Sequence, residues 1–413
     1  TGVPVYGINQ VAANVLFDEN GKILALYIDQ LEVVTPNYDG PGAPHFSGFP
    51  GQGGYNQDED HDGKIEGLSA DSRDHFLAEI DGWITKRERG EGYHMVLGSW
   101  QTQMDFYQSF FTGKTAAEIE DWFRRYCSDI NGRPLKITDS SDPADSAKYD
   151  ALSRQEKDML ADVVSGATIS LNDSHGNIIA AISTAYENRK PVVITGAERI
   201  GIGIASNGRL GPGADDQNVP VYSFNEVFAN TVFDAEGRIT AISIDSLEVA
   251  TPNYDGEGMP HLSGLPGQKP YNADLDHDGR VETTITPTQE TFLTEIGEWI
   301  TKRDRGDGYH LVTGNWASQM NVFESLFIGK TAAEVEEWFE KYCSDINGRP
   351  LRITDSSDPA DSAKYDALNQ QEKDMLADVV SGATISLNDS HGNMIAAVRK
   401  SFENAVPCSL TGR

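Results

Sequence analysis

The chain is a tandem repeat, and this feature constrains its fold more than any other. Asp58 and Thr168 recur as Asp274 and Thr384, each 216 positions further on, and the register holds without a gap. This period is far longer than the roughly 20–50 residues of a solenoid unit, so each copy is expected to be a whole domain. The predicted division is a first repeat at 1–196, a Gly-rich lead-in or linker at 197–218, and a second repeat at 219–413.

A β-hairpin is predicted near the start of each repeat. Asn20-Gly21 lies between apolar, β-rich runs at 11–17 and 23–34, which is a strong hairpin signal. Glu236-Gly237 occupies the same place in the second repeat.

The composition limits the classes of partner. The 413-residue chain has a formal net charge of −31 and a pI near 4.5. Nucleic acids and anionic membrane surfaces attract basic patches, so this charge argues against both and suits a protein working outside a cell. No apolar run reaches the roughly 18 residues of a membrane-spanning helix. No signal peptide is present, and the abrupt start at Thr1 is compatible with removal of a leader.

The three cysteines are Cys127, Cys343 and Cys408. Unpaired cysteine usually behaves as a small buried hydrophobe, so we expect buried free thiols. A Cys343–Cys408 disulfide in the second repeat alone is the alternative. No Cys/His spacing of the metal-binding type is visible.

The string Asp-Val-Val-Ser-Gly-Ala-Thr occurs at 162–168 and again, letter for letter, at 378–384. Each copy lies between two helix-like runs. The small residues would let the backbone turn sharply and let a bulky group come close. We expect Thr168 near the start of a helix, where free N–H groups and the positive dipole end favour a phosphate. The alternative is an ordinary helix N-cap, for which Ser and Thr are common.

With Ser170 added, this string resembles the flavinylation motif of FMN-binding domains. Such domains occur in the sodium-pumping NADH:quinone reductase, in the Rnf complex and in surface flavoproteins of Gram-positive bacteria. The resemblance implies that a flavin transferase uses FAD and magnesium to join FMN phosphate to the hydroxyls of Thr168 and Thr384. It implies an α+β fold, in which each domain has an antiparallel sheet, flanking helices and the FMN-bearing threonine at a helix start. The other motif residues that it assigns to cofactor binding are Asp162, Ser165, Gly166, Ala167, Asp378, Ser381, Gly382 and Ala383.

The segment at 85–123 is similar to the region before the flavin site in the Gram-positive surface proteins, including its Gln103-Met104 pair. Aromatic and methionine side chains there could line a flavin pocket. Ordinary core packing is the alternative, because clusters at such spacing usually pack together. The candidates are Tyr93, Trp100 and Met104 in the first repeat, and Tyr309, Trp316 and Met320 in the second. Capping boxes at Thr115/Glu118 and Thr331/Glu334 predict the start of an amphipathic helix in each repeat.

Each repeat also carries an acidic loop of the calcium-binding type. Alternating aspartates, a glycine at position six and a β-branched residue at position eight match such a loop. Position twelve is Ser69 or Ile285 rather than Glu, so the last ligand would come from elsewhere, with Asp74 and Glu290 as candidates. A solvated acidic turn is the alternative. The predicted metal residues, with position seven lending its carbonyl, are Asp58, Asp60, Asp62, Lys64 and Glu66, and Asp274, Asp276, Asp278, Arg280 and Glu282.

The resemblance implies a cell-surface or extracellular flavoprotein that shuttles electrons through two covalent FMN groups. The acidic loops predict one Ca²⁺ per repeat. The partners of the flavoprotein would be a flavin transferase, an electron donor on the membrane side and an extracellular acceptor. Attachment to the surface or membrane would use a segment absent from this chain. No Ser/His/Asp order, Cys/His pair or HExxH motif is found, so we expect an electron carrier more than an enzyme. The alternatives are a calcium-stiffened surface spacer or adhesin repeat without flavin, and an electron-transfer module of a larger extracellular reductase.

Overall fold

The computed structural model describes residues 2–40, 42–93, 95, 97–136, 142–193, 196–309, 311, 313–352 and 358–408, and it has the predicted α+β fold. The strands are β1 (Gly7–Phe17), β2 (Ile23–Val34), β3 (Asn56–Gln57), β4 (Gly67–Leu68), β5 (Asn172–Asp173), β6 (Gly176–Asn177), β7 (Arg199–Ala214), β8 (Pro220–Phe233), β9 (Ile239–Ala250), β10 (Tyr271–Ala273), β11 (Thr283–Ile285), β12 (Asn388–Asp389), β13 (Gly392–Asn393) and β14 (Val406–Pro407). The helices are α1 (Arg73–Asp81), α2 (Trp100–Phe111), α3 (Ala116–Tyr126), α4 (Pro143–Asp150), α5 (Arg154–Gly166), α6 (Ile178–Glu187), α7 (Gln289–Gly297), α8 (Trp316–Phe327), α9 (Ala332–Tyr342), α10 (Pro359–Asp366), α11 (Gln370–Gly382) and α12 (Met394–Glu403), with 3₁₀ turns η1 (Gly90–Gly92) and η2 (Gly306–Gly308).

The chain forms two compact units, and neither coincides with one of the two sequence repeats. One unit combines Thr1–Ile8, Val33–Trp83 and Gly203–Glu403. The other combines Asn9–Glu32, Ile84–Ile202 and Asn404–Arg413. The loop-rich segment that carries the first acidic loop therefore belongs to the unit that holds most of the second repeat.

Both predicted hairpins are present. β1 and β2 form a two-stranded sheet, and the N–H of Asp18 donates to the carbonyl of Lys22 (2.8 Å) across the turn. Gly21 has a φ of 76°, a left-handed backbone conformation that glycine adopts without steric cost, and this explains why glycine occupies the position. β8 pairs antiparallel with β9, from Ser223 opposite Ala250 to Phe233 opposite Ile239.

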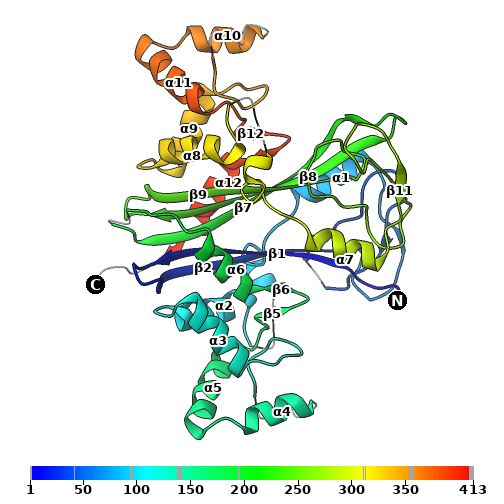
Figure 1. The fold of residues 1–413 in the computed structure, drawn as a ribbon, viewed down its shortest axis with the longest axis vertical. Helices are drawn as coiled ribbons and strands as arrows, with labels where there is room; N and C mark the ends of the chain where they lie inside the picture. The colour runs from blue at the N-terminus through cyan, green and yellow to red at the C-terminus, as the bar shows by residue number, and fades with distance from the viewer. Residues whose placement is uncertain are drawn as a thin grey trace. The chain divides into compact units, whose positions relative to one another are not determined.

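The larger sheet has the strand order β14-β7-β8-β9, and α12 packs on it (Figure 1). The backbones come very close at this contact, because a Cβ on Gly203 of β7 would overlap the carbonyl oxygen of Ala397 in α12. Glycine is therefore required there for helix-to-sheet packing, rather than for an unusual φ.

Helices recur along the chain with the same offset as the sequence. α2 begins at Trp100 and α8 begins 216 positions later at Trp316. The predicted capping boxes are present: the threonine hydroxyl accepts the N3 backbone N–H and the glutamate accepts the N–H of the threonine, at the start of α3 and of α9. The local signals at helix starts were therefore sufficient to place these elements.

The cysteines are free and buried, as predicted. Burial raises the pKa of the Cys127 and Cys343 thiols well above its ordinary value. Both therefore stay protonated at neutral pH and contribute to packing rather than to thiolate chemistry.

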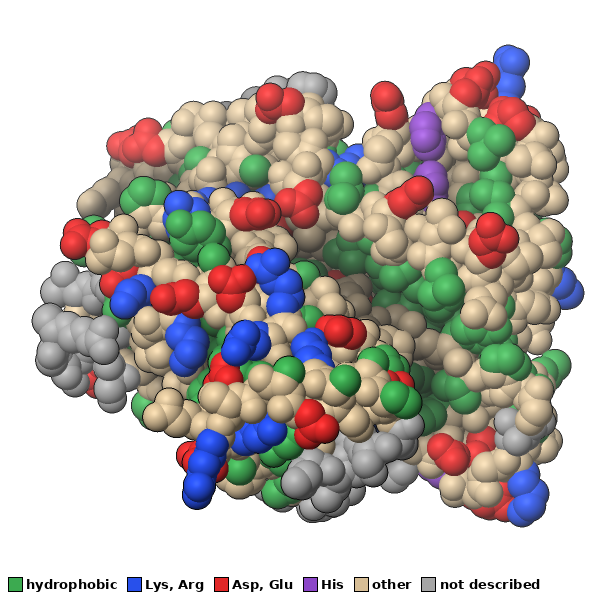
Figure 2. All heavy atoms as spheres, turned by 60° about the horizontal axis from the view of Figure 1, so that its bottom comes forward, with side chains coloured by type: hydrophobic (Ala, Val, Ile, Leu, Met, Phe, Trp, Pro, Cys, Tyr) green, Lys and Arg blue, Asp and Glu red, His purple; other side chains and the backbone are tan. Residues whose placement is uncertain are grey.

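Across the described part of the chain, none of the helices combines the length and apolar character needed to cross a bilayer. On the face drawn in Figure 2, acidic and basic side chains lie interspersed rather than gathered into one patch of a single sign. Charge on this face therefore does not mark one binding surface.

Candidate functional site

The predicted attachment threonines follow a helix instead of starting one. α5 ends at Gly166, Ala167 is extended (φ −152°, ψ 136°), and Thr168 comes next, ten positions before α6 begins at Ile178. Thr384 lies in the same place after α11. The prediction of a helix start is therefore wrong. The preceding helix points the negative end of its dipole toward this turn, so attraction of a phosphate to a helix N-terminus does not operate here.

The small residues of the motif continue the helix, which is the physical reason for this correction. The Ser165 hydroxyl donates to the carbonyl oxygen of Asp162 (2.7 Å), and Ser381 does the same to Asp378 (2.7 Å). These bonds are made within the last helical turn and leave all four side chains exposed. The acidic position and the serine of the motif are thus accessible beside the threonine.

A buried glutamine of α2 holds the turn. Its Oε1 accepts the backbone N–H groups of Thr168 (2.8 Å) and Ile169 (3.1 Å), and it lies 3.4 Å from Oγ1 of Thr168. This residue is Gln103, which is 1% exposed. Gln319 of α8, 0% exposed, makes the same contacts in the second repeat, at 2.7 Å to the N–H of Thr384, 3.1 Å to the next N–H and 3.3 Å to the hydroxyl.

The contact between Gln103 and the turn at Thr168 was not predicted from the sequence. The signal was a polar residue on an otherwise apolar helix face formed by Trp100, Met104 and Tyr107, all of which are buried. Because a buried polar group is nearly always hydrogen-bonded, that position alone would have indicated a partner elsewhere in the fold.

The motif glycine allows the helix to approach an aromatic ring closely. A Cβ on Gly166 would overlap the ring of Phe106 in α2. In the second repeat, a Cβ on Gly382 would lie 2.9 Å from Cγ2 of Val322. The bulky group that these small residues admit is therefore, in this structure, a side chain of the same chain.

The predicted flavin-pocket residues of the first repeat lie around the turn. Trp100 and Met104 belong to one hydrophobic cluster together with Ala167 and Ile169, and Tyr93 packs against it. Trp100 is 3% exposed and Met104 0% exposed. The turn is thus anchored in a core on one side, which agrees with the packing alternative for these two side chains, while the Thr168 side chain is half-buried.

The second repeat repeats this burial. Trp316 is 3% exposed and Met320 0% exposed, whereas Tyr309 is half-buried. The guanidinium of Arg305 lies 4.4 Å from the ring centroid of Tyr309, and that of Arg89 lies 4.2 Å from that of Tyr93. Each tyrosine face is occupied by a cation of its own repeat.

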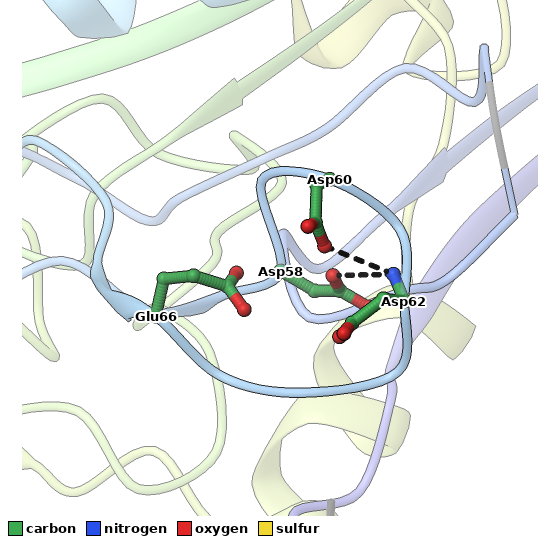
Figure 3. Close-up of side chains that lie close together, drawn as sticks. All are labelled: Asp58, Asp60, Asp62 and Glu66. Carbon is green, nitrogen blue, oxygen red and sulfur yellow. Dashed lines mark hydrogen bonds between the residues drawn. The ribbon is translucent and has the colours of Figure 1, made fainter.

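The first acidic loop brings four carboxylates together (Figure 3). One oxygen from each of Asp58, Asp60, Asp62 and Glu66 lies within 4.8 Å of the others. Asp58 is only 1% exposed, and its carboxylate accepts the backbone N–H groups of Asp62 (3.1 Å) and Gly63 (2.8 Å). Gly63 has a φ of 81°, which closes the loop.

The second acidic loop has the same arrangement, with Asp274 2% exposed. Its four carboxylates also lie within 4.8 Å of one another, and they come from Asp274, Asp276, Asp278 and Glu282. Convergent carboxylate oxygens suit a hard cation such as Ca²⁺, so this donor set fits the predicted ion.

The carbonyls of Lys64 and Arg280 stay predicted ligands, whereas the two candidates for the last ligand lie outside the clusters. The N–H groups of Lys64 and Arg280 donate to Asp62 (2.9 Å) and Asp278 (3.0 Å). The Lys64 ammonium also pairs with Asp62, and this hydrogen bond lowers the pKa of the Asp62 carboxyl. In the part of the chain that the structure describes, the acidic clusters include neither Asp74 nor Glu290.

One carboxylate near the second acidic loop was not predicted from the sequence. Asp216, from the lead-in segment, accepts the backbone N–H of Val281 (3.1 Å). This contact ties the lead-in to the second loop.

The chain is similar to a chlorophenol reductase from Desulfitobacterium hafniense, with 38% identity over 194 residues, 45% of this chain and 51% of the relative. The chain thus spans about half the length of the curated relative that it matches. No protein-family model matches the chain, and no solved structure matches it. These findings connect part of the chain with a redox protein.

Proposed function

We propose that this chain is a flavoprotein of two tandem homologous FMN-binding domains, with one FMN joined through a phosphoester bond to Thr168 and one to Thr384. The repeated turn carries the proposal. Each threonine has a half-buried side chain at the edge of a core, and each is held by a buried glutamine with hydrogen bonds that agree to within 0.1 Å between repeats. The exposed aspartate and serine of the motif lie in the preceding helical turn.

The attachment is a phosphoryl-group transfer with FAD as the donor. The threonine Oγ attacks the phosphorus on the riboflavin side of FAD, so that an Oγ–P bond forms and the P–O bond to the AMP half breaks. AMP leaves with the bridging oxygen, and the hydroxyl proton passes to a base. A flavin transferase with Mg²⁺ would supply FAD and position it, and no oxidant or reductant is consumed.

The proposed role is electron transfer outside the cell. Bound FMN supplies one- and two-electron redox chemistry, while the protein supplies tethering and orientation. Similarity to a reductase over part of the chain supports a redox role. The net charge of −31 agrees with an extracellular setting, between a membrane-side donor and an extracellular acceptor.

A second candidate is an electron-transfer module of a larger extracellular reductase. The coverage favours it, because the matched region is 51% of a relative named as a reductase. In that case the flavins would feed electrons to a catalytic part outside the matched region. The full gene sequence on both sides of this chain separates a carrier from such a module.

The mass of the denatured protein tests covalent attachment. With an active flavin transferase and FAD, the chain should gain two FMN units less two waters, and Thr168→Ala and Thr384→Ala should each gain one. Thr331→Ala, at a helix cap away from both turns, is the matched control and should gain two. Flavin that stays covalently bound in the double variant would refute the assignment. No gain in the wild type would favour the spacer or adhesin alternative.

We further propose that each acidic loop binds one Ca²⁺. The convergence of four carboxylate oxygens within 4.8 Å supports this, because like charges so close repel one another unless a cation lies between them. Calorimetry of the demetallated protein should show two sites, and Asp58→Asn or Asp274→Asn should each remove one. Asp74→Asn, outside the clusters, should keep both. An absence of calcium uptake by the wild type would contradict the proposal.

A further inference from the structure

The glutamine amide beneath each attachment turn has a side without a strong partner. Its Oε1 accepts two backbone N–H groups, one from the threonine and one from the next residue. Two N–H donors can be satisfied only by an acceptor, so the orientation of the amide is determined by its contacts. The Nε2 group of Gln103 and of Gln319 therefore faces away from the backbone of the turn.

Within the described part of the chain, this Nε2 group lacks a good acceptor in both repeats. Nε2 of Gln319 is buried and, among the described residues, has no hydrogen-bond partner. Nε2 of Gln103 has, among the residues that the structure describes, the thioether sulfur of Met95 as its one acceptor, at 3.8 Å, and a thioether is a weak acceptor. Leu311 replaces Met95 in the second repeat and removes even that contact.

Such a donor is costly, so its retention needs a reason. A buried N–H group without a partner loses the hydrogen bonds that water would give it, and native structures keep few of them. A glutamine that only held the turn would need its oxygen and not its nitrogen. An amide donor with no partner among the described residues at Gln319, and with only a weak sulfur acceptor there at Gln103, points to a ligand group that the two sites share.

The threonine hydroxyl identifies the place of that ligand. Oε1 lies 3.4 Å from Oγ1 of Thr168 and 3.3 Å from Oγ1 of Thr384. Nε2 and Oε1 belong to one amide, so the free N–H donors lie within one amide width of Oε1. A phosphoryl group on Oγ1 would bring anionic oxygens into this space, and a hydrogen bond to an anion is stronger than one between neutral groups.

We propose that Gln103 and Gln319 are phosphate-contacting residues: Oε1 holds the threonine in position, and Nε2 donates to a non-bridging oxygen of the FMN phosphodiester. This inference rests on the proposed function, in which FMN phosphate is joined to these threonines. It adds a specific ligand group for a side chain that the attachment motif itself does not contain.

The rate of FMN attachment at each site tests the inference, with the other repeat as an internal control. Gln103→Glu keeps an acceptor for the two N–H groups, removes the amide donor and adds a negative charge. With FAD, Mg²⁺ and a flavin transferase, the initial rate at the Thr168 peptide should fall at least about tenfold, as expected for loss of one hydrogen bond to a charged group. The rate at the Thr384 peptide of the same molecules should not change. Gln319→Glu should reverse the pattern.

Hydrogen exchange of the backbone N–H groups in the turn separates contact with the phosphate from a purely structural role of the glutamine. The N–H groups of Thr168 and Ile169 should keep their slow hydrogen exchange in Gln103→Glu, because the acceptor remains. Attachment at the wild-type rate in this variant would overturn the inference while leaving the proposed function intact. A wild type that takes up no FMN at either threonine would overturn both.

A second measurement does not depend on any variant. In the wild-type chain with ¹⁵N-labelled glutamine, attachment of FMN should shift the Nε2–H signals of Gln103 and Gln319 and slow their exchange with water. Signals that are the same before and after attachment at both threonines would overturn the inference.

Discussion

Arg87 of the first repeat and Arg303 of the second occupy equivalent positions, with side chains 4% and 16% exposed, and each forms an ion pair with a carboxylate of the following helix. The two carboxylates occupy positions one helical turn apart. In the first repeat Arg87 pairs with Asp105 (2.8 Å) and donates to Oε1 of Gln108 (2.7 Å). The same Gln108 oxygen accepts the N–H of Ile28 in β2 (2.7 Å). The Asp105 side chain is 45% exposed, so this ion pair lies partly in water.

In the second repeat the carboxylate has moved inward. Arg303 pairs with Glu324 and donates to Asn321 (3.1 Å), and the Glu324 oxygen accepts the N–H of Ile244 in β9 (2.7 Å). The Glu324 side chain is only 9% exposed. In each repeat, one of these two helix positions carries a carboxylate and the other a neutral amide, and the two repeats have them in opposite order. Either order works because both positions reach the same guanidinium.

Glu324→Gln should have the largest effect on stability. It keeps the acceptor for Ile244 but removes the carboxylate that pairs with the Arg303 guanidinium, and removal of one partner of a largely buried pair costs about 3–5 kcal/mol. We expect the urea midpoint of the transition that involves this repeat to fall by an amount equivalent to about 3 kcal/mol. Asp105→Asn is the matched variant, and it should cost about 1 kcal/mol or less because its pair is partly exposed.

The double variant Asn321→Asp/Glu324→Gln sharpens this test. It transfers the first repeat's arrangement to the second and should recover much of the lost stability. Equal losses in Glu324→Gln and Asp105→Asn, or no recovery in the double variant, would show that burial of the carboxylate does not distinguish the two repeats.

Asp29, beside Arg87, should make stability depend on pH. Burial raises the pKa of Asp29 to about 6, from an ordinary value of 3.8, in spite of the attraction of Arg87 and a hydrogen bond from Thr85. A raised carboxyl pKa stabilises the fold below about pH 4, and this contribution is lost as the pH rises through 6. The free energy of unfolding of the wild type relative to Asp29→Asn should therefore fall by up to about 3 kcal/mol between pH 4 and 7.

Asp245 is the equivalent of Asp29 in the second repeat, so the pH dependence of stability can be compared between the two positions. Burial also raises the pKa of Asp245, so Asp245→Asn should change the pH dependence with the same sign. Denaturation at several pH values measures both variants. A difference between wild type and Asp29→Asn that stays constant from pH 4 to 7 would contradict the expectation.

Gly166→Ala should destabilise the turn at Thr168 more than Gly382→Ala destabilises the turn at Thr384. The new methyl group would overlap the Phe106 ring, and overpacking of this kind costs about 1–3 kcal/mol. At Gly382 the neighbour is Val322 at 2.9 Å, which a rotation can relieve, and alanine gains up to about 1 kcal/mol in helix propensity. Thermal unfolding measures both, and Phe106→Val should rescue Gly166→Ala; without rescue the cause lies elsewhere.

Tyr107→Phe should have the smallest effect. The Tyr107 hydroxyl donates to the buried carbonyl of Ile169 (3.0 Å), and Phe323 occupies the equivalent position in the second repeat. Loss of this bond should cost about 1 kcal/mol. If this hydrogen bond stabilises the turn at Thr168, hydrogen exchange of the Thr168 amide should become as fast in the variant as exchange of the Thr384 amide. Unchanged exchange would remove this contact as a difference between the turns.

Much of the local structure and the acidic loops could be predicted from the sequence. The hairpin at Asn20-Gly21, the capping box at Thr115 and the cluster around Asp58 all depend on residues a few positions apart. The position of Thr168 relative to a helix could not be predicted, because Ser-Gly-Ala can either end a helix or continue it. The contact with Gln103 supports the backbone just after the helix end.

The sequence by itself determined the repeat. It also determined the hairpin turns, the helix caps and the alternation of carboxylates, because these follow from short-range geometry. The tertiary structure alone decided which side chains meet across long stretches of chain. Gln103 contacts a turn 65 positions away, and Val33–Trp83 joins the compact unit of Gly203–Glu403. Such contacts depend on the burial of apolar surface between distant segments, and no local pattern specifies which segments will pair.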